Sequence, residues 1–292
     1  MPYHIGCPVW ANSRWNGTLY SRSATRDDYL PQYSSVFNTV EVNSTFYGLP
    51  AQATALRWAE SVALGFRFAT KFPKDITHER RLSTTKAETS MFIELLETFR
   101  QYDCLGPSFL QLPPTFSGSE FPKLQRFIEE WPAEFPLAVE VRHRDYFDDG
   151  PIENGFEKLL RERQFDRVLL DSRPLYSAPA TDESEARSQT RKPNVPFRTS
   201  VTGSIPFVRF IGRNQLERVQ PWVAEWAPVV ADWIESGLTP YIFLHTPDDF
   251  FAPELARRFH QELSKYLPTL PDLASWPGER DDEAGFKQKR LF

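Results

Sequence analysis

The chain has 292 residues, of which 40% are hydrophobic and 14% aromatic, so it has the material for one large core and is not a disordered protein. Its net charge of −5 excludes a global basic field for nucleic acid, although a local basic site is compatible with it. Neither the opening MPYHIGCPVW nor any later apolar run has the length of a membrane span, so we expect a cytoplasmic protein without a membrane partner.

Short β-rich runs bounded by turn residues predict eight strands, with helices in most of the intervals between them. The predicted strands are 4–10, 39–45, 66–72, 107–113, 137–143, 167–172, 206–213 and 240–246, and the predicted helices are 25–37, 53–62, 85–102, 121–131, 155–165, 215–236 and 253–267. This alternation is typical of the α/β class and predicts a single (β/α)8 TIM-type barrel domain over residues 1–270.

The predicted helix 85–102 shows how such a helix would cover the sheet. An apolar stripe runs along one face and comprises Met91, Leu95, Phe99 and Tyr102. Thr85 and Glu88 have the spacing of a capping box at its start. We therefore expect this face to be buried and this helix to begin at Thr85.

Two segments depart from the regular alternation. The interval 173–205, between the sixth and seventh strands, is polar, rich in Pro and nearly free of helical periodicity, so it predicts an irregular insertion that is either a lid or a tolerated loop. Residues 271–292 carry ERDDE and KQKR and predict a solvated C-terminal extension. The two cysteines, Cys7 and Cys104, have no metal-like spacing and predict two buried thiols.

The alternation along each strand predicts which side chains enter the barrel lumen. In a parallel barrel the outward face packs under helices and is apolar, so Val40 and Val42 send Glu41 and Asn43 inward. The same parity predicts a set of polar lumen residues that comprises Lys71, Gln111, Glu140, Arg142, Asp171, Arg209, Arg213 and His245. Most of them come late in their strands, at the C-terminal mouth where barrel enzymes place their active sites.

The chemistry of this set favours an anionic ligand. Lys71, Arg142, Arg209 and Arg213 are the donors that phosphate or carboxylate recognition requires. Because a buried unpaired charge is costly, these groups either bind a ligand or neutralise carboxylates in a buried network. The sequence leaves both interpretations open.

Several stretches, taken together, resemble the YecE-like family, catalogued as domain of unknown function 72. The matching stretches are GCPVW (6–10), VEVNSTFY (40–47), KFPKDITH (71–78), QLPP (111–114), EVRH (140–143) and VRFIG (208–212). The chain departs from the family pattern at 144–147, where the family often continues with Pro-Ser-Trp, and at His245 and Thr246, where it often has Asn-Asn. The resemblance implies a TIM-type barrel and no established reaction.

We expect an enzyme that binds a phosphorylated or carboxylate-bearing small molecule at the mouth and uses Glu or His acid–base chemistry. The candidate catalytic residues are Glu41, Glu140, Lys71 and His78. The candidate substrate-binding residues are Trp10, Asn43, Tyr47, Gln111, Arg142, His143, Asp171, Arg209, Arg213 and His245. No cofactor is predicted.

Three alternatives remain at this point. The first is a non-catalytic module that binds a nucleotide or single-stranded nucleic acid by stacking on Trp10, Trp15, Phe46 and Tyr47. The second is a divalent-metal-dependent hydrolase or isomerase with Glu41, Glu140, Asp171 and His245 around the metal. The third is a glycoside hydrolase that uses Glu41 and Glu140 as its carboxylate pair.

Overall fold

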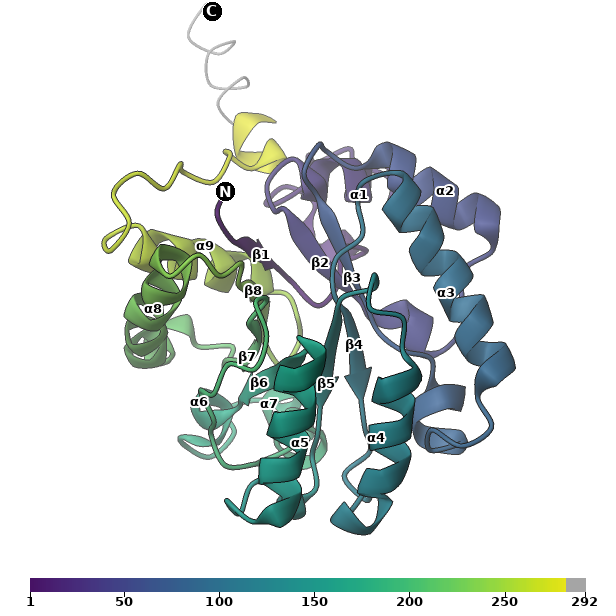
Figure 1. The fold of residues 1–292 in the computed structure, drawn as a ribbon. Coiled ribbons are helices and arrows are strands. Elements are labelled where there is room, and N and C mark those ends of the chain that lie inside the picture. The colour runs from purple at the N-terminus through teal and green to yellow at the C-terminus, as the bar shows by residue number, and fades with distance from the viewer. Residues whose placement is uncertain (282–292) are drawn as a thin grey trace, which may run out of the picture.

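The computed structural model describes residues 1–281, in which strands alternate with helices along the chain (Figure 1). All eight predicted strand regions contain a strand. The strands are β1 (His4–Gly6), β2 (Thr39–Val42), β3 (Arg67–Thr70), β4 (Ser108–Gln111), β5 (Leu137–Glu140), β6 (Asp166–Asp171), β7 (Phe207–Ile211) and β8 (Tyr241–His245). The α-helices are α1 (Arg26–Ser34), α2 (Gln52–Ser61), α3 (Lys86–Gln101), α4 (Phe121–Glu130), α5 (Pro151–Arg163), α6 (Arg173–Tyr176), α7 (Glu183–Arg191), α8 (Gln220–Glu235) and α9 (Ala252–Leu263).

The strand pairings are all parallel, but hydrogen bonding divides the strands into two sheets. Six strands form one sheet in the order β1-β8-β7-β6-β5-β4, and β2 pairs with β3. An isolated bridge joins Phe68 to Leu105 on one side of this pair, and Glu41 N donates to Cys7 O at 3.1 Å on the other. The α/β fold with a curled parallel sheet is confirmed, whereas the described residues do not form one unbroken eight-stranded ladder.

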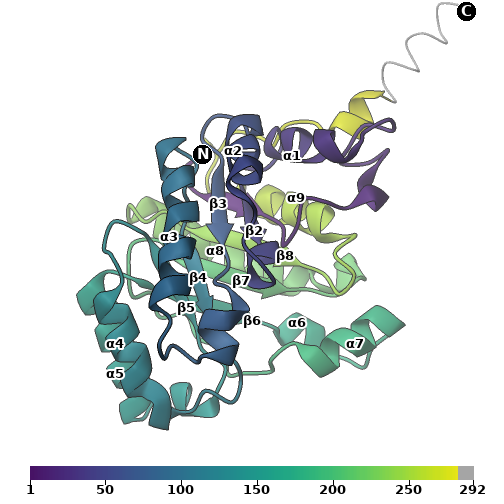
Figure 2. The same ribbon diagram turned by 90° about the vertical axis from the view of Figure 1, so that its right-hand side faces the viewer.

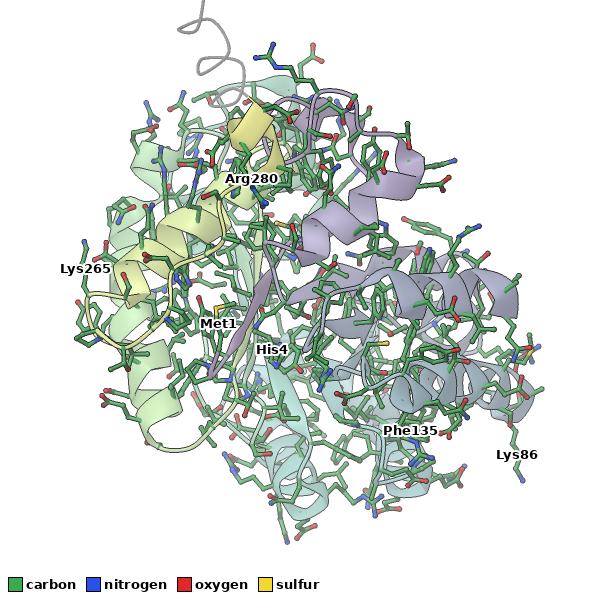
Figure 3. All side chains as sticks on the ribbon, turned by 90° about the horizontal axis from the view of Figure 1, so that it is seen from above. Met1, His4, Lys86, Phe135, Lys265 and Arg280 are labelled. Atoms are coloured by element: carbon green, nitrogen blue, oxygen red, sulfur yellow. The ribbon has the colours of Figure 1, made fainter. Side chains whose placement is uncertain are left out.

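An apolar layer fills the space that the strands enclose. Its buried members are Ala69, Phe109, Ala138, Val168, Phe207, Tyr241 and Phe243. The Phe207 ring lies 5.4 Å from the Phe109 ring and 4.8 Å from the Phe243 ring, centre to centre. At the amino end of the strands His4 stacks on Tyr241 at 4.2 Å, and Figure 3, seen from this end, shows His4 close to the centre of the molecule. We call this layer the apolar floor, because the polar groups lie above it.

Helix α3 corrects two details of the sequence analysis. Leu95 and Phe99 are buried as predicted, together with Phe92 and Leu96, but Met91 is 57% and Tyr102 42% exposed. The buried face is therefore rotated from the predicted stripe.

The predicted capping box at the start of α3 is wrong. Thr85 makes no side-chain cap hydrogen bond, and Glu88 pairs with Arg80 at 2.8 Å. A capping box forms instead at α1, where the Asp28 carboxylate accepts a hydrogen bond from the Thr25 N–H at 2.8 Å. The spacing of Thr85 and Glu88 does not show whether the Glu88 carboxylate accepts a hydrogen bond from the Thr85 N–H or pairs with Arg80.

The interval 173–205 is not irregular throughout, because it contains α6 and α7. Asp182 caps α7 by accepting a hydrogen bond from Glu185 N at 2.8 Å. Glu185 in turn forms a fully buried ion pair with Arg213, at 2.6 Å from Nη2 to Oε2. Figure 2 shows α6 and α7 together at the lower right, away from the end where the N-terminus lies. A polar helix held by an ion pair and by hydrogen bonds to residues elsewhere in the chain leaves little periodicity to detect.

The beginning of the predicted C-terminal extension packs against the domain. Trp276 is 6% exposed, and the Arg257 guanidinium lies 3.6 Å from the centre of its ring. Arg257 also pairs with Glu279 at 2.6 Å. Residues 282–292, which include the KQKR run, lie outside the described residues.

Two further observations concern the cysteines and the helices. Cys7 and Cys104 are both buried and free, which confirms the predicted pair of buried thiols. Among residues 1–281, no helix combines the length and the apolar character that a membrane crossing requires.

Candidate functional site

A layer of charged side chains lies directly on the apolar floor, at the carboxyl ends of the strands. Its centre is Arg209 of β7, whose guanidinium carbon lies 5.1 Å from the centre of the Phe109 ring. Arg209 donates from Nε and Nη2 to Glu41 of β2, at 2.6 and 3.0 Å, and from Nη1 to Glu140 of β5 at 2.6 Å. These three residues are buried, so one guanidinium connects three strands across the lumen.

Glu41 has further partners on two strand ends. Its Oε2 accepts a hydrogen bond from Asn43 Nδ2 at 3.0 Å, and its Oε1 lies 3.1 Å from His245 Nε2. Burial alone would raise the pKa of Glu41, but the charge of Arg209 and the hydrogen bonds from Arg209 and His245 outweigh it and hold the pKa well below the usual range. Burial lowers the pKa of His245 to about 4, so its imidazole is neutral at pH 7 and donates from Nε2 to the ionised carboxylate.

Glu140 is equally occupied. Its Oε1 accepts hydrogen bonds from Arg142 Nε at 2.5 Å and from Gln111 Nε2 at 3.1 Å. Burial raises the pKa of Glu140, but Arg142 and Arg209 outweigh that effect and lower the pKa to about 2. Both glutamates are therefore ionised at neutral pH and fully hydrogen bonded, which leaves them little capacity to exchange a proton.

Lys71, just after β3, contributes an amine of a different kind. It is 9% exposed, and its Nζ lies 4.2 Å from the centre of the Phe46 ring. Within residues 1–281 this Nζ has no carboxylate partner and no hydrogen bond. Burial and repulsion from Arg209 and Arg142 lower the pKa of Lys71 to about 7, although Glu140 and Glu41 oppose the shift. The amine is thus close to half protonated at neutral pH.

Above this layer lies a cavity of approximately 620 Å³, which we call the mouth pocket. Its lining is basic, because six cationic side chains face two carboxylates, Asp248 and Asp249. The six are Lys71, Arg142, Arg187, Arg191, Lys192 and Arg209. Arg209 and Arg142 pair with Glu41 and Glu140, and Arg14 pairs with Asp248. Arg187 and Arg191, together with the two lysines, therefore face Asp249 alone, so the pocket attracts anions.

Three of these cations come from α7 and the residue after it, and the sequence analysis missed them. Arg187, Arg191 and Lys192 have no ion pair or side-chain hydrogen bond among residues 1–281. Burial lowers the pKa of Lys192 and repulsion from Arg209 lowers it further, while Asp249 opposes both effects. The available signal was the run RSQTRK at 187–192, inside the interval that we interpreted as either lid or loop.

The structure brings most of the predicted site residues together. The mouth pocket is lined by Asn43, Tyr47, Lys71, Gln111, Arg142, Arg209 and His245, and Glu41 and Glu140 hydrogen bond to its lining from below. Trp10 lines an adjoining pocket. Asp171, Arg213, His78 and His143 do not line the mouth pocket.

The prediction that Asp171 faces the lumen is wrong. Its Oδ2 accepts a hydrogen bond from the indole N–H of Trp226 in α8 at 2.8 Å, and it pairs with Arg173 at 2.7 Å. Residues 168–170 form an unbroken apolar run, so this strand offers no alternation from which to read a face. Val168 belongs to the apolar floor, and the two-residue period then directs position 171 outward.

Arg213 and the two histidines have structural partners instead. Arg213 is committed to Glu185 and to the carbonyl oxygens of Ala178 and Pro179, so it holds α7 in place. His78 lies 2.8 Å from Thr77 Oγ1, and burial together with repulsion from Lys71 lowers its pKa to about 4.

The other histidine, His143, has a capping role. Its Nδ1 accepts a hydrogen bond from Asp145 N at 3.3 Å at the start of a short 3₁₀ turn. The His143 ring therefore contacts its own loop, whereas the His78 ring also packs edge-on against Phe46, at 4.9 Å between ring centres.

The aromatic residues proposed for stacking are not equally accessible. Trp15 is 1% exposed and donates from Nε1 to Phe250 O, so its predicted stacking role is wrong. Tyr47 is 85% exposed at the rim of the mouth pocket, and Phe46 lies against Lys71.

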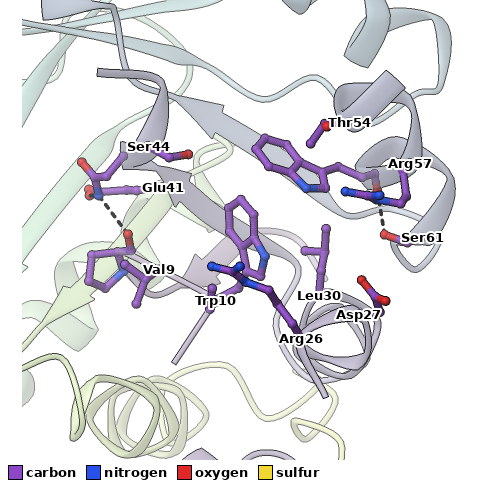
Figure 4. A pocket seen from close by; sticks show the side chains of 14 residues that line it. Val9, Trp10, Arg26, Asp27, Leu30, Glu41, Ser44, Thr54, Arg57 and Ser61 are labelled. Atoms are coloured by element: carbon purple, nitrogen blue, oxygen red, sulfur yellow. Dashed lines mark hydrogen bonds between the residues drawn. The ribbon is translucent and has the colours of Figure 1, made fainter. Parts of the chain in front are cut away.

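Trp10 lines a second cavity of approximately 520 Å³, the tryptophan pocket, with Trp58 of α2 as its other aromatic wall (Figure 4). The two indole rings are 5.1 Å apart at an interplanar angle of 82°. The tryptophan pocket and the mouth pocket share Pro8, Val9 and Asn43 in their linings, so the two cavities adjoin.

The residues named for a metal site have other partners. Glu41 and Glu140 bind Arg209, and His245 binds Glu41. Among residues 1–281, no group of three or more His, Cys, Asp or Glu side chains is arranged as a metal site.

The comparison with known sequences covers nearly the whole chain. Residues 4–278 match the model of the family described as protein of unknown function DUF72. The chain is 35% identical over 274 residues to the UPF0759 protein YecE of Escherichia coli (strain K12), which covers 94% of this chain and 97% of that protein. It is also 24% identical over 149 residues to the UPF0759 protein YunF of Bacillus subtilis (strain 168), over 49% of this chain and 52% of that protein.

Solved structures share the fold. The crystal structure of a DUF72 family protein from Thermotoga maritima superposes with a TM-score of 0.69 at 20% identity, over 90% of this chain and 99% of that chain. A DUF72 family protein from Enterococcus faecalis superposes with a TM-score of 0.64 at 20% identity, over 83% of this chain and 94% of that chain. These likenesses concern the fold alone.

Proposed function

The chain belongs to the DUF72 family of proteins of unknown function, and we propose from its site that it is an enzyme acting on a small phosphorylated or carboxylate-bearing substrate. The substrate binds in the mouth pocket, and Lys71 moves a proton to or from it. The observation that carries the proposal is the Lys71 amine, which has a pKa of about 7 and, within residues 1–281, no carboxylate partner in a pocket that five other basic side chains line.

Two sets of donors would hold the anionic group. Arg142 uses only Nε for Glu140, so its two terminal nitrogens can form a bidentate contact with phosphate or carboxylate oxygens. To the same lining α7 supplies Arg187 and Arg191, followed by Lys192. An anion between these sets would relieve the mutual repulsion of the cations, which is what a binding site for a charged substrate requires.

Proton transfer is assigned to Lys71 and not to the glutamates. A general acid or base works best with a pKa near the working pH, and burial gives this lysine such a value. Glu41 and Glu140 act as positioning residues, because their charges fix Arg209 and thereby the wall of the pocket. The proposal requires no cofactor.

We also propose that residues 1–270 form one (β/α)8 domain, in which the β2–β3 pair closes the barrel between β1 and β4. Supporting this, Phe72 N donates to Phe109 O at 3.2 Å on the β4 side, and Glu41 N donates to Cys7 O at 3.1 Å on the β1 side. Closure would keep water from the buried charges of Glu41 and Glu140 and maintain their attraction to Arg209.

A substrate screen with matched lysine variants tests the proposal. Thermal shift with phosphorylated and carboxylate-bearing metabolites identifies binders, and NMR then follows each binder for turnover. We expect Lys71→Met to abolish turnover, and Lys158→Met to retain it because the Lys158 side chain is 76% exposed on α5. Binding without turnover by the wild-type protein would favour the non-catalytic module, and unchanged turnover by Lys71→Met would reject the assignment of Lys71.

A further inference from the structure

We propose that the tryptophan pocket is a second subsite, which accepts a planar heteroaromatic ring joined to the anionic group in the mouth pocket. This inference rests on the proposed function and narrows its substrate class to ring-bearing anions, with a nucleoside monophosphate as the simplest probe. The known family description assigns neither pocket.

The two tryptophans provide surfaces for a ring. Trp10 follows β1 and Trp58 lies in α2, and both are half-buried, so each ring keeps an accessible part. Trp10 also packs against Phe68 at 6.4 Å between ring centres, which holds its indole in place. Figure 4 shows the Trp10 indole within the pocket lining, between Val9 and Arg57. Perpendicular, anchored indoles favour a flat group that stacks on one ring and meets the edge of the other.

Polar groups around the tryptophans favour a heteroaromatic ring over a hydrocarbon. Arg26 of α1 and Arg57 of α2 line the pocket, and neither has an ion pair or a side-chain hydrogen bond among residues 1–281. Asp27 lies in the same lining and supplies acceptor oxygens. Guanidinium groups stack on rings and donate to ring nitrogen or carbonyl atoms, while a carboxylate accepts from an exocyclic amino group. A heteroaromatic ring whose edge carries both hydrogen-bond acceptors and a hydrogen-bond donor matches these two arginines and the aspartate.

The wall between the pockets links the two subsites. Asn43 Nδ2 donates to Pro8 O at 2.9 Å and to Glu41 Oε2 at 3.0 Å, so the shared wall is tied to the buried charge layer. The cavities of about 520 and 620 Å³ each fall within the range of small-molecule sites, about 300–1,000 Å³. The two adjoining cavities can therefore hold one ligand, with its ring in the tryptophan pocket and its anionic group in the mouth pocket.

Calorimetry with three probes tests the inference. Inorganic phosphate probes the mouth pocket, ribose 5-phosphate adds the sugar, and adenosine 5′-monophosphate adds the ring. We expect adenosine 5′-monophosphate to bind roughly tenfold or more tightly than ribose 5-phosphate, since stacking on an aromatic side chain has an effect of this order. Trp58→Leu should remove this difference and leave phosphate affinity unchanged, and Arg57→Ala, which changes an exposed side chain, should reduce it. Trp222→Leu on α8, outside both linings, serves as the control.

The outcomes separate the two proposals. If ribose 5-phosphate and adenosine 5′-monophosphate bind the wild-type protein equally, or if Trp58→Leu and Arg57→Ala both keep the difference, the ring subsite is rejected while the anion site stands. If inorganic phosphate and both phosphate esters fail to bind, this inference is rejected and the proposed function keeps only its carboxylate-bearing substrates, which the substrate screen with Lys71→Met then tests by itself.

Discussion

Replacing Arg209 with Met isolates the contribution of the buried charge layer. The change leaves Glu41 and Glu140, both 0% exposed, without their shared guanidinium, while the methionine fills much of the vacated volume. Removing one partner of a buried ion pair costs about 3–5 kcal/mol. Arg142 still contacts Glu140 at 2.5 Å, which offsets part of the loss at that carboxylate. We therefore expect the free energy of unfolding at pH 7 to fall by about 3 kcal/mol or somewhat more.

The pH dependence of this loss has a definite sign. In the wild-type protein both glutamates have a pKa below the ordinary 4.5, so their contribution to stability is present above pH 4.5 and is lost as the pH falls toward the folded-state values, about 2 for Glu140. Without Arg209, burial raises the pKa of Glu41 against the remaining hydrogen bonds from His245 and Asn43, so the variant loses stability as the pH rises above 4.5. The difference between the two proteins should be larger at pH 7 than at pH 4.

Urea unfolding at pH 4 and pH 7 measures both effects. Arg14→Met is the control, because Arg14 pairs with Asp248 at the surface with 57% of its side chain exposed, and we expect its cost to stay below about 1 kcal/mol. Adding Glu41→Gln and Glu140→Gln to Arg209→Met should restore part of the stability by removing the uncompensated charges. A loss below about 1 kcal/mol at pH 7, or the same loss at both pH values, would refute the reasoning.

Three further predictions concern Lys71, the helix α7 and the close contact between β1 and β2. Sulfate, whose charge is constant in this range, should bind roughly tenfold more weakly at pH 8 than at pH 6 as Lys71, with its pKa of about 7, loses its proton. Titration calorimetry should find a shallower profile in Lys71→Met, in which Asp249, whose pKa burial raises to about 6, still titrates in the same pocket. Glu185→Gln breaks the buried ion pair between α7 and Arg213 and should speed proteolysis within 173–205 several-fold. Glu183→Gln, which changes an exposed residue of the same helix, is the control, and equal cleavage of the two variants would contradict this role of Glu185. Gly6→Ala places a Cβ 1.9 Å from a carbonyl oxygen of β2 and should lower the free energy of unfolding, measured by chemical denaturation, by about 1–3 kcal/mol. Gly48→Ala is the control and should lower it much less, because a Cβ at Gly48 would have no described atom within 4 Å.

The strands were predictable because their signal is local. Each strand combines β-branched or aromatic residues with a nearby turn, and residues 39–45 and 137–143 also alternate in polarity. The helix α7 was not predictable in this way. Only Glu185 and Ser188 of its nine residues are buried, and the partner that holds it, Arg213, lies 28 residues further along the chain. A helix without an apolar face depends on contacts that periodicity does not reveal.

The sequence by itself determined which polar side chains enter the lumen wherever a strand alternates, because the two-residue period of a strand is a property of the backbone. Glu41 and Glu140 follow from that rule, and Asp171 shows its limit in a strand that is apolar on both faces. Only the tertiary structure decided which charges pair. Arg209 reaches carboxylates 168 and 69 residues away because strand order and register place them opposite it. Because Glu41 and Glu140 pair with Arg209, the Lys71 amine in the mouth pocket has no carboxylate partner among residues 1–281.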